Sequence, residues 1–110
     1  MQILRGTFDG DLCVTESLVI DGEIQRSTTV ADGGRLALHG ICGGDVTVER
    51  GGVAELWGVI RGSVRNRGGR VTIAGMVEGD VDAPAGETCI IPTSIIRGTV
   101  RLAGAGSGAT

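Results

Sequence analysis

The segment at residues 40–57, GICGGDVTVERGGVAELW, recurs along the chain at nearly constant spacing. Each copy starts at a small residue, and five of the six then carry a Gly followed by Asp, Ser or Thr. The starts are Gly6, Gly22, Gly40, Gly58, Gly75 and Ser94, spaced 16, 18, 18, 17 and 19 residues apart. A fixed short period is typical of a solenoid, in which each copy buries its apolar face against its neighbours. We therefore expect one β-helix repeat domain at residues 1–103, with about six coils of 16–19 residues, and a flexible C-terminal tail at residues 104–110.

The aligned copies share apolar columns. Two residues after each start stand Phe8, Ile24, Cys42, Ile60, Val77 and Ile96, and six after it stand Leu12, Thr28, Val46, Val64, Val81 and Val100. Further apolar pairs lie two residues apart before each next start, such as Leu36 and Leu38, and Ile90 and Pro92 in the fifth copy. Spacing of two is strand periodicity, and Gly fits tight corners. The fold class predicted is all-β, a three-sided parallel β-helix (β-solenoid), with Val46, Val64 and Val81 stacked in its core.

Charged residues form columns of their own in the last three copies. Three residues after the start stand Arg61, Glu78 and Arg97, and seven after it stand Arg65, Asp82 and Arg101. Opposite charges on facing strand positions are favourable, so both columns support the same alignment.

Composition excludes several classes of function. The net charge is −3, which argues against nucleic acid as a partner. No apolar run is long enough for a transmembrane segment and no signal peptide pattern is present, so we expect a cytoplasmic protein. The three cysteines, Cys13, Cys42 and Cys89, lack metal-ligand spacing and fit reduced thiols. Cys42 falls in an inward column, where it acts as a small apolar residue.

Catalytic groups do not converge in the repeat. The chain has one His, His39, and no Tyr. An acyltransferase-like left-handed β-helix also has 18-residue coils and uses a His, but Leu38, Leu56 and Ile73 stand where its hexapeptide pattern disfavours large residues. We therefore expect a protein that is not an enzyme and has no cofactor.

Asp11, Asp45 and Asp80 each follow a Gly, which raises the alternative of calcium binding. Ser27, Ser63 and Thr99 alternate with them, however, and calcium requires several oxygen ligands within one loop. We expect no metal site.

One outward position carries aromatic side chains. The residues just before each start are Arg5, Asp21, His39, Trp57, Ala74 and Thr93. Trp57 is the only Trp of the chain, and Trp is frequent among the residues that anchor protein interfaces. His39 and Trp57 are therefore the candidate protein-interaction face.

The repeat GICGGDVTVERGGVAELWG, continued as GVIRGSVRNRGGRVTIAGMVEGDV, resembles the bactofilin family of polymer-forming bacterial cytoskeletal proteins. The resemblance covers nearly all of residues 6–102 and implies a right-handed β-helix that associates end to end into filaments without nucleotide. The chain differs from the family in lacking a polar N-terminal arm and an aromatic residue near the C-terminal end of the core.

Two hypotheses of function follow. Neither end of the stack carries an evident cap, so the partner can be the protein itself; the end-stacking candidates are Ile3, Leu4, Phe8, Val100 and Leu102. The alternative is a β-helix that binds a specific protein through one face, such as an immunity protein that neutralises a cognate toxin.

Overall fold

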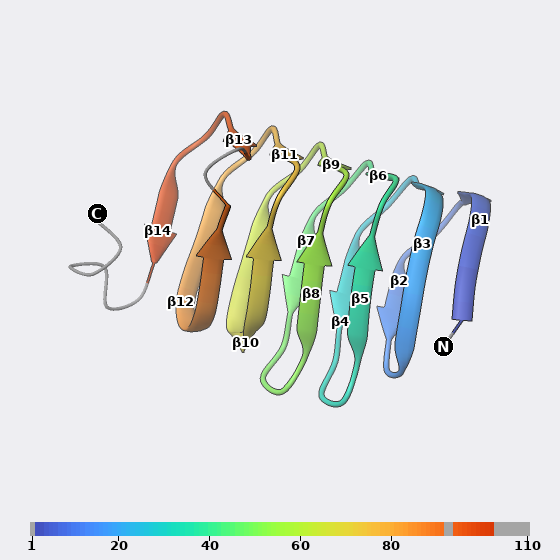
Figure 1. Ribbon diagram of the computed structural model, residues 1–110, viewed down its shortest axis with the longest axis horizontal. Helices are drawn as coiled ribbons and strands as arrows, with labels where there is room; N and C mark the ends of the chain where they lie inside the picture. The colour runs from blue at the N-terminus through green and yellow to red at the C-terminus, as the bar shows by residue number, and fades with distance from the viewer. Residues whose placement is uncertain (1, 92–93, 103–110) are drawn as a thin grey trace.

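A computed structural model describes residues 2–91 and 94–102, in which every strand pairs in parallel with a strand of a neighbouring copy (Figure 1). The tail expected at residues 104–110 lies outside the described part. The strands stack along the longest axis of the molecule, with the first and last strands at opposite ends of the stack (Figure 1). The architecture is the predicted all-β solenoid.

Three parallel ladders form the sides of the solenoid, and each copy contributes one rung to each. The first ladder comprises β1 (Gln2–Phe8), β3 (Ser17–Ile24), β5 (Arg35–Leu38), β8 (Val53–Leu56), the end of β10 (Val64–Ile73) and the end of β12 (Val81–Ile90). The second begins with the last residues of β1 and β3 and continues through β6 (Ile41–Cys42), β9 (Val59–Ile60), β11 (Met76–Val77) and β13 (Ile95–Ile96). The third comprises β2 (Leu12–Val14), β4 (Thr28–Val30), β7 (Val46–Val48), the starts of β10 and β12, and β14 (Val100–Leu102).

The core consists of the inward columns, as predicted. Val46 pairs with Val64, and Val64 pairs with Val81, and all three side chains are at most 1% exposed. Cys42 is also buried, between Ile24 and Ile60 of the same column. Because side chains alternate across a strand, these residues face inward while their neighbours face solvent.

At the starts of the second to fifth copies, glycine is required for reasons of space. A Cβ atom added at Gly40 would collide with the carbonyl oxygen of Gly22, and one added at Gly58 with that of Gly40. The turns between the third and first ladders need glycine for a different reason, because Gly33 and Gly51 have φ angles of 83° and 85°. Both kinds of glycine let successive coils follow the same path.

The alignment of the fifth copy, which starts at Gly75, needs one correction. We expected Ile90 and Pro92 as its inward pair, but Val71 pairs with Thr88, and Ile73 pairs with Ile90. The turn that contains Gly86 has the same length as the one that contains Gly69, so Glu87 stays opposite Arg70, with which it forms an ion pair at 3.1 Å. The two additional residues of this copy therefore fall between Ile91 and Ser94, and Pro92 itself lies outside the described residues.

Candidate protein-interaction face

The two aromatic residues singled out in the sequence lie together on the surface. His39 follows β5 and Trp57 follows β8, and their backbones are on adjacent rungs because the N–H of Trp57 donates to the carbonyl of Leu38. The rings are parallel to within 4°, with centroids 6.3 Å apart. Trp57 is 52% exposed. The structure thus brings together the pair that was predicted.

The outward column formed by the residue just before each start differs from the prediction at its last position. The N–H of Ile91 donates to Ile73, just as that of Ala74 donates to Leu56, so Ile91 continues the column after Ala74. Thr93, which we placed there, lies outside the described residues.

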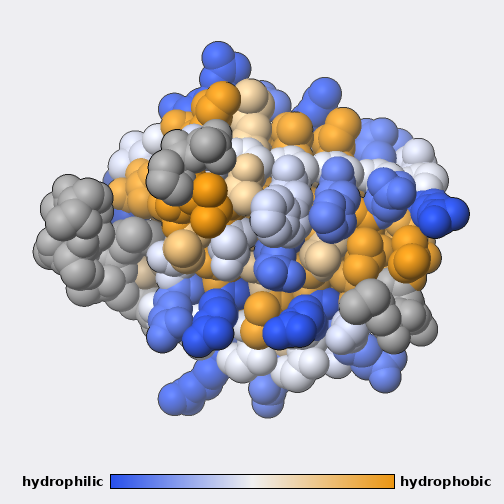
Figure 2. Space-filling model, in the orientation of Figure 1, coloured by the Kyte–Doolittle hydropathy of each residue, from blue (hydrophilic) through white to orange (hydrophobic). Residues whose placement is uncertain are grey.

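The residue after the start is apolar in the third to sixth copies and forms an apolar strip that the sequence reading missed. We use this name for Ile41, Val59, Met76 and Ile95, which pair with one another along the second ladder. Ile41 is 36% exposed and Ile95 is 53% exposed, and the two between them are half-buried. Orange atoms gather along the upper edge of the molecule, where β6, β9, β11 and β13 lie (Figure 2). Four apolar residues at one outward position of successive copies were the available signal.

A shallow groove separates part of the apolar strip from the aromatic pair. It follows the glycine corner from Gly6 to Gly58, with His39 along one side and Ile41 and Val59 along the other. The groove exists because the glycine corner carries no side chains between two rows of outward residues. The strip and the aromatic pair therefore belong to one surface.

Charged residues border the apolar strip on its other side. Arg61, Glu78 and Arg97 follow β9, β11 and β13 on successive rungs, and all three are exposed. The ion pairs formed within the described residues lie elsewhere, between Arg67 and Glu49 and between Arg70 and Glu87. Residues 61, 78 and 97 thus present alternating charge beside an apolar surface.

The aspartates considered for calcium make hydrogen bonds between coils instead. Asp45 Oδ1 accepts from the N–H of Ser63, and Asp80 Oδ1 accepts from that of Thr99, both at 2.8 Å. Ser63 Oγ in turn accepts from the N–H of Asp80 at 3.1 Å. These residues belong to one Asp/Ser column, which comprises Asp11, Ser27, Asp45, Ser63, Asp80 and Thr99. Among the described residues, no group of three His, Cys, Asp or Glu side chains is placed to hold a metal ion.

The Cys42 thiol lies in the core rather than at the surface. Its sulfur is within hydrogen-bonding range of the carbonyls of Arg26 and Gly44, at 3.5 Å each. Burial raises the pKa of the thiol above its ordinary value of 9.0. Cys13 and Cys89 are exposed. Cys42 is thus a protonated core residue and not a nucleophile.

The predicted end-stacking residues occupy the two terminal rungs. Leu4 and Phe8 pack half-buried against the core, whereas Ile3 is 57% exposed on the outer side of β1. Val100 is 40% exposed at the opposite end, and the Leu102 side chain lies outside what the structure describes.

Comparison of the chain with protein-family models, with curated proteins and with solved structures finds no match. The part of the chain that the structure describes contains no helix with the length and apolar character of a membrane span. The parallel ladders place the chain in the class of parallel β-solenoids.

Proposed function

We propose that this protein is a non-enzymatic structural β-solenoid that associates end to end with further copies into a polymer. The observation that carries the proposal is the pairing of the terminal strands. Within residues 2–91 and 94–102, β1 and β2 at one end pair on one side only, as do β13 and β14 at the other. Unpaired strand edges are templates for another chain.

The apolar columns support a head-to-tail arrangement. The first rungs present Leu4, Phe8 and Leu12, all half-buried, and the last rungs present Ile90, Ile96 and Val100 in the same three columns. If a second copy continues the stack, Ile90 lies against Leu4 and Val100 lies against Leu12. Each column then continues with an apolar residue, and parallel strand pairing is kept.

The polar columns fit the same join. The Asp/Ser column alternates through the chain and ends on Thr99, so the next copy resumes with Asp11 and the alternation is unbroken. Arg97 meets Asp9 of the next copy, a favourable pair of opposite charges. A join between two different ends repeats without limit when it does not close into a ring, which makes a filament. The resemblance of the repeat to bactofilins points to the same function.

Val100→Glu tests the join. A carboxylate placed against Leu12 of the next copy is costly to desolvate. We expect the wild type to grow in mass with concentration in light scattering, and Val100→Glu to remain small while its circular dichroism is unchanged. Arg101→Gln, on the same rung but facing outward, is the matched control and should assemble as the wild type does. A wild type that never exceeds two chains at high concentration in low salt would contradict end-to-end assembly.

Charge exchange tests the head-to-tail direction. Asp9→Arg and Arg97→Asp each place like charges at the join and should slow assembly, whereas the double variant restores opposite charges and should recover it. Since exposed pairs contribute about 0 to 1 kcal/mol, the effect is best read as a shift in the concentration at which assembly begins. Failure of the double variant to recover would argue against this direction.

A further inference from the structure

The apolar strip is a surface that end-to-end stacking leaves uncovered. Ile41, Val59, Met76 and Ile95 lie on the side of the solenoid, along the second ladder, and their side chains do not point to either end. Large apolar side chains aligned on successive rungs expose a continuous apolar surface, and such surfaces mark interaction sites. The residues that border the strip determine which partner fits it.

We propose that two copies of this chain pair side by side through the apolar strip, in opposite directions, about a two-fold axis between the rungs of Val59 and Met76. In this arrangement Val59 of one copy lies against Met76 of the other, and Ile41 lies against Ile95. The contact is isologous, because the same surface of both copies is used and each pairing occurs twice.

Charge complementarity favours this partner and this register. Arg61 borders the rung of Val59, and Glu78 borders the rung of Met76. The two-fold axis therefore places Arg61 of each copy opposite Glu78 of the other. On the other side of the strip, Trp57 comes to face Ala74 of the second copy, so that the large indole meets a small residue.

Other registers pair the charged and apolar residues less completely. A shift of one rung in one direction sets Arg61 against Arg61 of the second copy, and a shift in the other sets Glu78 against Glu78. If both copies instead run in the same direction about a two-fold axis, Arg61 faces Trp57 and Glu78 faces Ala74 of the second copy, and neither residue offers an opposite charge. Of the antiparallel registers, only the proposed one pairs Arg with Glu and also gives all four residues of the strip an apolar partner.

Arg61→Glu and Glu78→Arg, each made separately in the Val100→Glu background to block the ends, provide the test. We expect Val100→Glu alone to reach the mass of two chains in light scattering. Each added substitution should raise the dissociation constant about tenfold or more, because it converts both symmetric contacts from attraction to repulsion.

An equimolar mixture of the two variants should form the pair again. In the mixed pair, the carboxylate introduced at position 61 of one chain faces the guanidinium introduced at position 78 of the other. The second contact of the same pair joins the native Arg61 to the native Glu78, so both contacts are attractive. Only the pairs formed between identical variants are repulsive.

The apolar part of the contact is tested with Met76→Glu, which should also abolish pairing. Thr47→Glu, on the third ladder beside Arg65, is the control and should pair normally. Thermal melting of each variant checks that the fold is retained. Variants that melt like the parent but pair as well as it does would overturn the proposal.

These measurements also distinguish self-pairing through the apolar strip from binding of a different protein there. If Val100→Glu remains a single chain at high concentration in low salt, or if the mixed variants do not associate, self-pairing is wrong and the surface is left to a different protein. Because the ends are blocked in all these variants, the result does not depend on whether the wild type forms filaments.

Discussion

The imidazole of His39 and the indole of Trp57 stack in parallel on adjacent rungs, with their centroids 6.3 Å apart. Adjacent strands lie about 4.8 Å apart, so the rings stack with an offset along the ladder, an arrangement that aromatic pairs prefer. The residues that precede them, Leu38 and Leu56, point the other way and are buried in the core. The exposed aromatic pair thus lies directly over the buried core.

Trp57→Ala should change the stability of the single chain by about 1 kcal/mol or less, because about half of the indole is exposed and its stacking on His39 is the main interaction lost. Thermal melting of the end-blocked variant at low concentration measures this. The fluorescence of the parent should be that of a partly hydrated indole. A loss of several kcal/mol would mean that Trp57 supports the core.

Val64→Asp should unfold the domain. Val64 is fully buried between Val46 and Val81, and the narrow core offers no partner for a carboxylate. Such a burial costs several kcal/mol against a total stability of about 5 to 15 kcal/mol. Arg65→Gln, one residue further and exposed, is the control and should fold. Circular dichroism distinguishes them, and a well-folded Val64→Asp protein is incompatible with this core.

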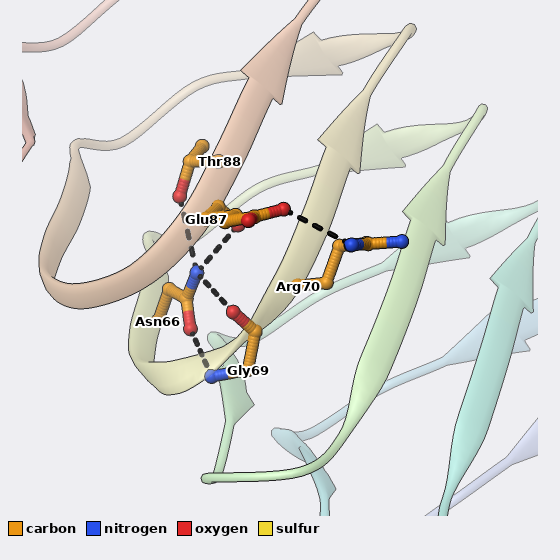
Figure 3. A network of polar contacts seen from close by, with 5 residues as sticks. All are labelled: Asn66, Gly69, Arg70, Glu87 and Thr88. Atoms are coloured by element: carbon orange, nitrogen blue, oxygen red, sulfur yellow. Dashed lines mark hydrogen bonds and ion pairs between the residues drawn. The ribbon is translucent and has the colours of Figure 1, made fainter.

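Asn66→Val should destabilise the fold even though Val48 occupies the same column one copy earlier. The buried Asn66 amide donates to the carbonyls of Gly69 and Glu87 and to Thr88 Oγ1, and its oxygen accepts from the N–H groups of Gly68 and Gly69 (Figure 3). Leaving buried groups without partners costs about 1 to 3 kcal/mol each, so we expect a loss of about 3 kcal/mol in urea unfolding.

Thr88→Val is the comparison for this variant, because it removes only one of the partners of Asn66 and should cost about 1 kcal/mol. An Asn66→Val protein as stable as the wild type would show that the network contributes nothing net.

The three cysteines should differ in how fast they react with a thiol reagent. Cys13 and Cys89 are exposed and should be labelled quickly by a thiol reagent in the native protein, whereas Cys42 should react only on unfolding. Rapid labelling of all three thiols in the folded state would contradict the position of Cys42.

The raised pKa of Cys42 also predicts a dependence of stability on pH. The unfolded chain releases this proton near the ordinary value of 9.0, whereas the folded protein retains it to higher pH. The contribution of the Cys42 thiol to the free energy of unfolding is therefore complete below pH 9. It is lost as the pH rises towards the pKa of the thiol in the folded protein. Denaturant unfolding of the wild type and of Cys42→Ala between pH 8 and 10 gives the free energy of unfolding of each as a function of pH. Two plots that stay parallel over this range would contradict the prediction.

The core could be predicted from sequence because each inward column is filled in every copy. Val46, Val64 and Val81 align without gaps, and strand alternation fixes their direction. The fifth copy was misaligned because Ile90 fits the column of either Val71 or Ile73 by apolar character alone. The length of the turn before Glu87 decides between the two, and turn length depends on backbone geometry that the pattern does not contain.

The surface was only partly predictable. Trp57 stood out as a single residue, whereas Ile41, Val59, Met76 and Ile95 are ordinary residues of a β-rich sequence. Their significance depends on which side of a very short strand faces solvent, and β6, β9, β11 and β13 are two residues long. A strand of two residues gives too little alternation to show that a column of outward positions is apolar.

The Asn66 network has a consequence for how such a chain finds its fold. Because the copies are nearly alike, a strand that pairs with the copy beyond its proper neighbour still fills every valine and isoleucine position, so misaligned stacks compete with the native one during folding. Asn66 interrupts that equivalence, because one partner of its amide, the Thr88 hydroxyl on the following rung, depends on which residue stands there. We expect the residue to act as a marker of position in an otherwise repetitive chain, and its loss to populate slipped, aggregation-prone species that refold slowly.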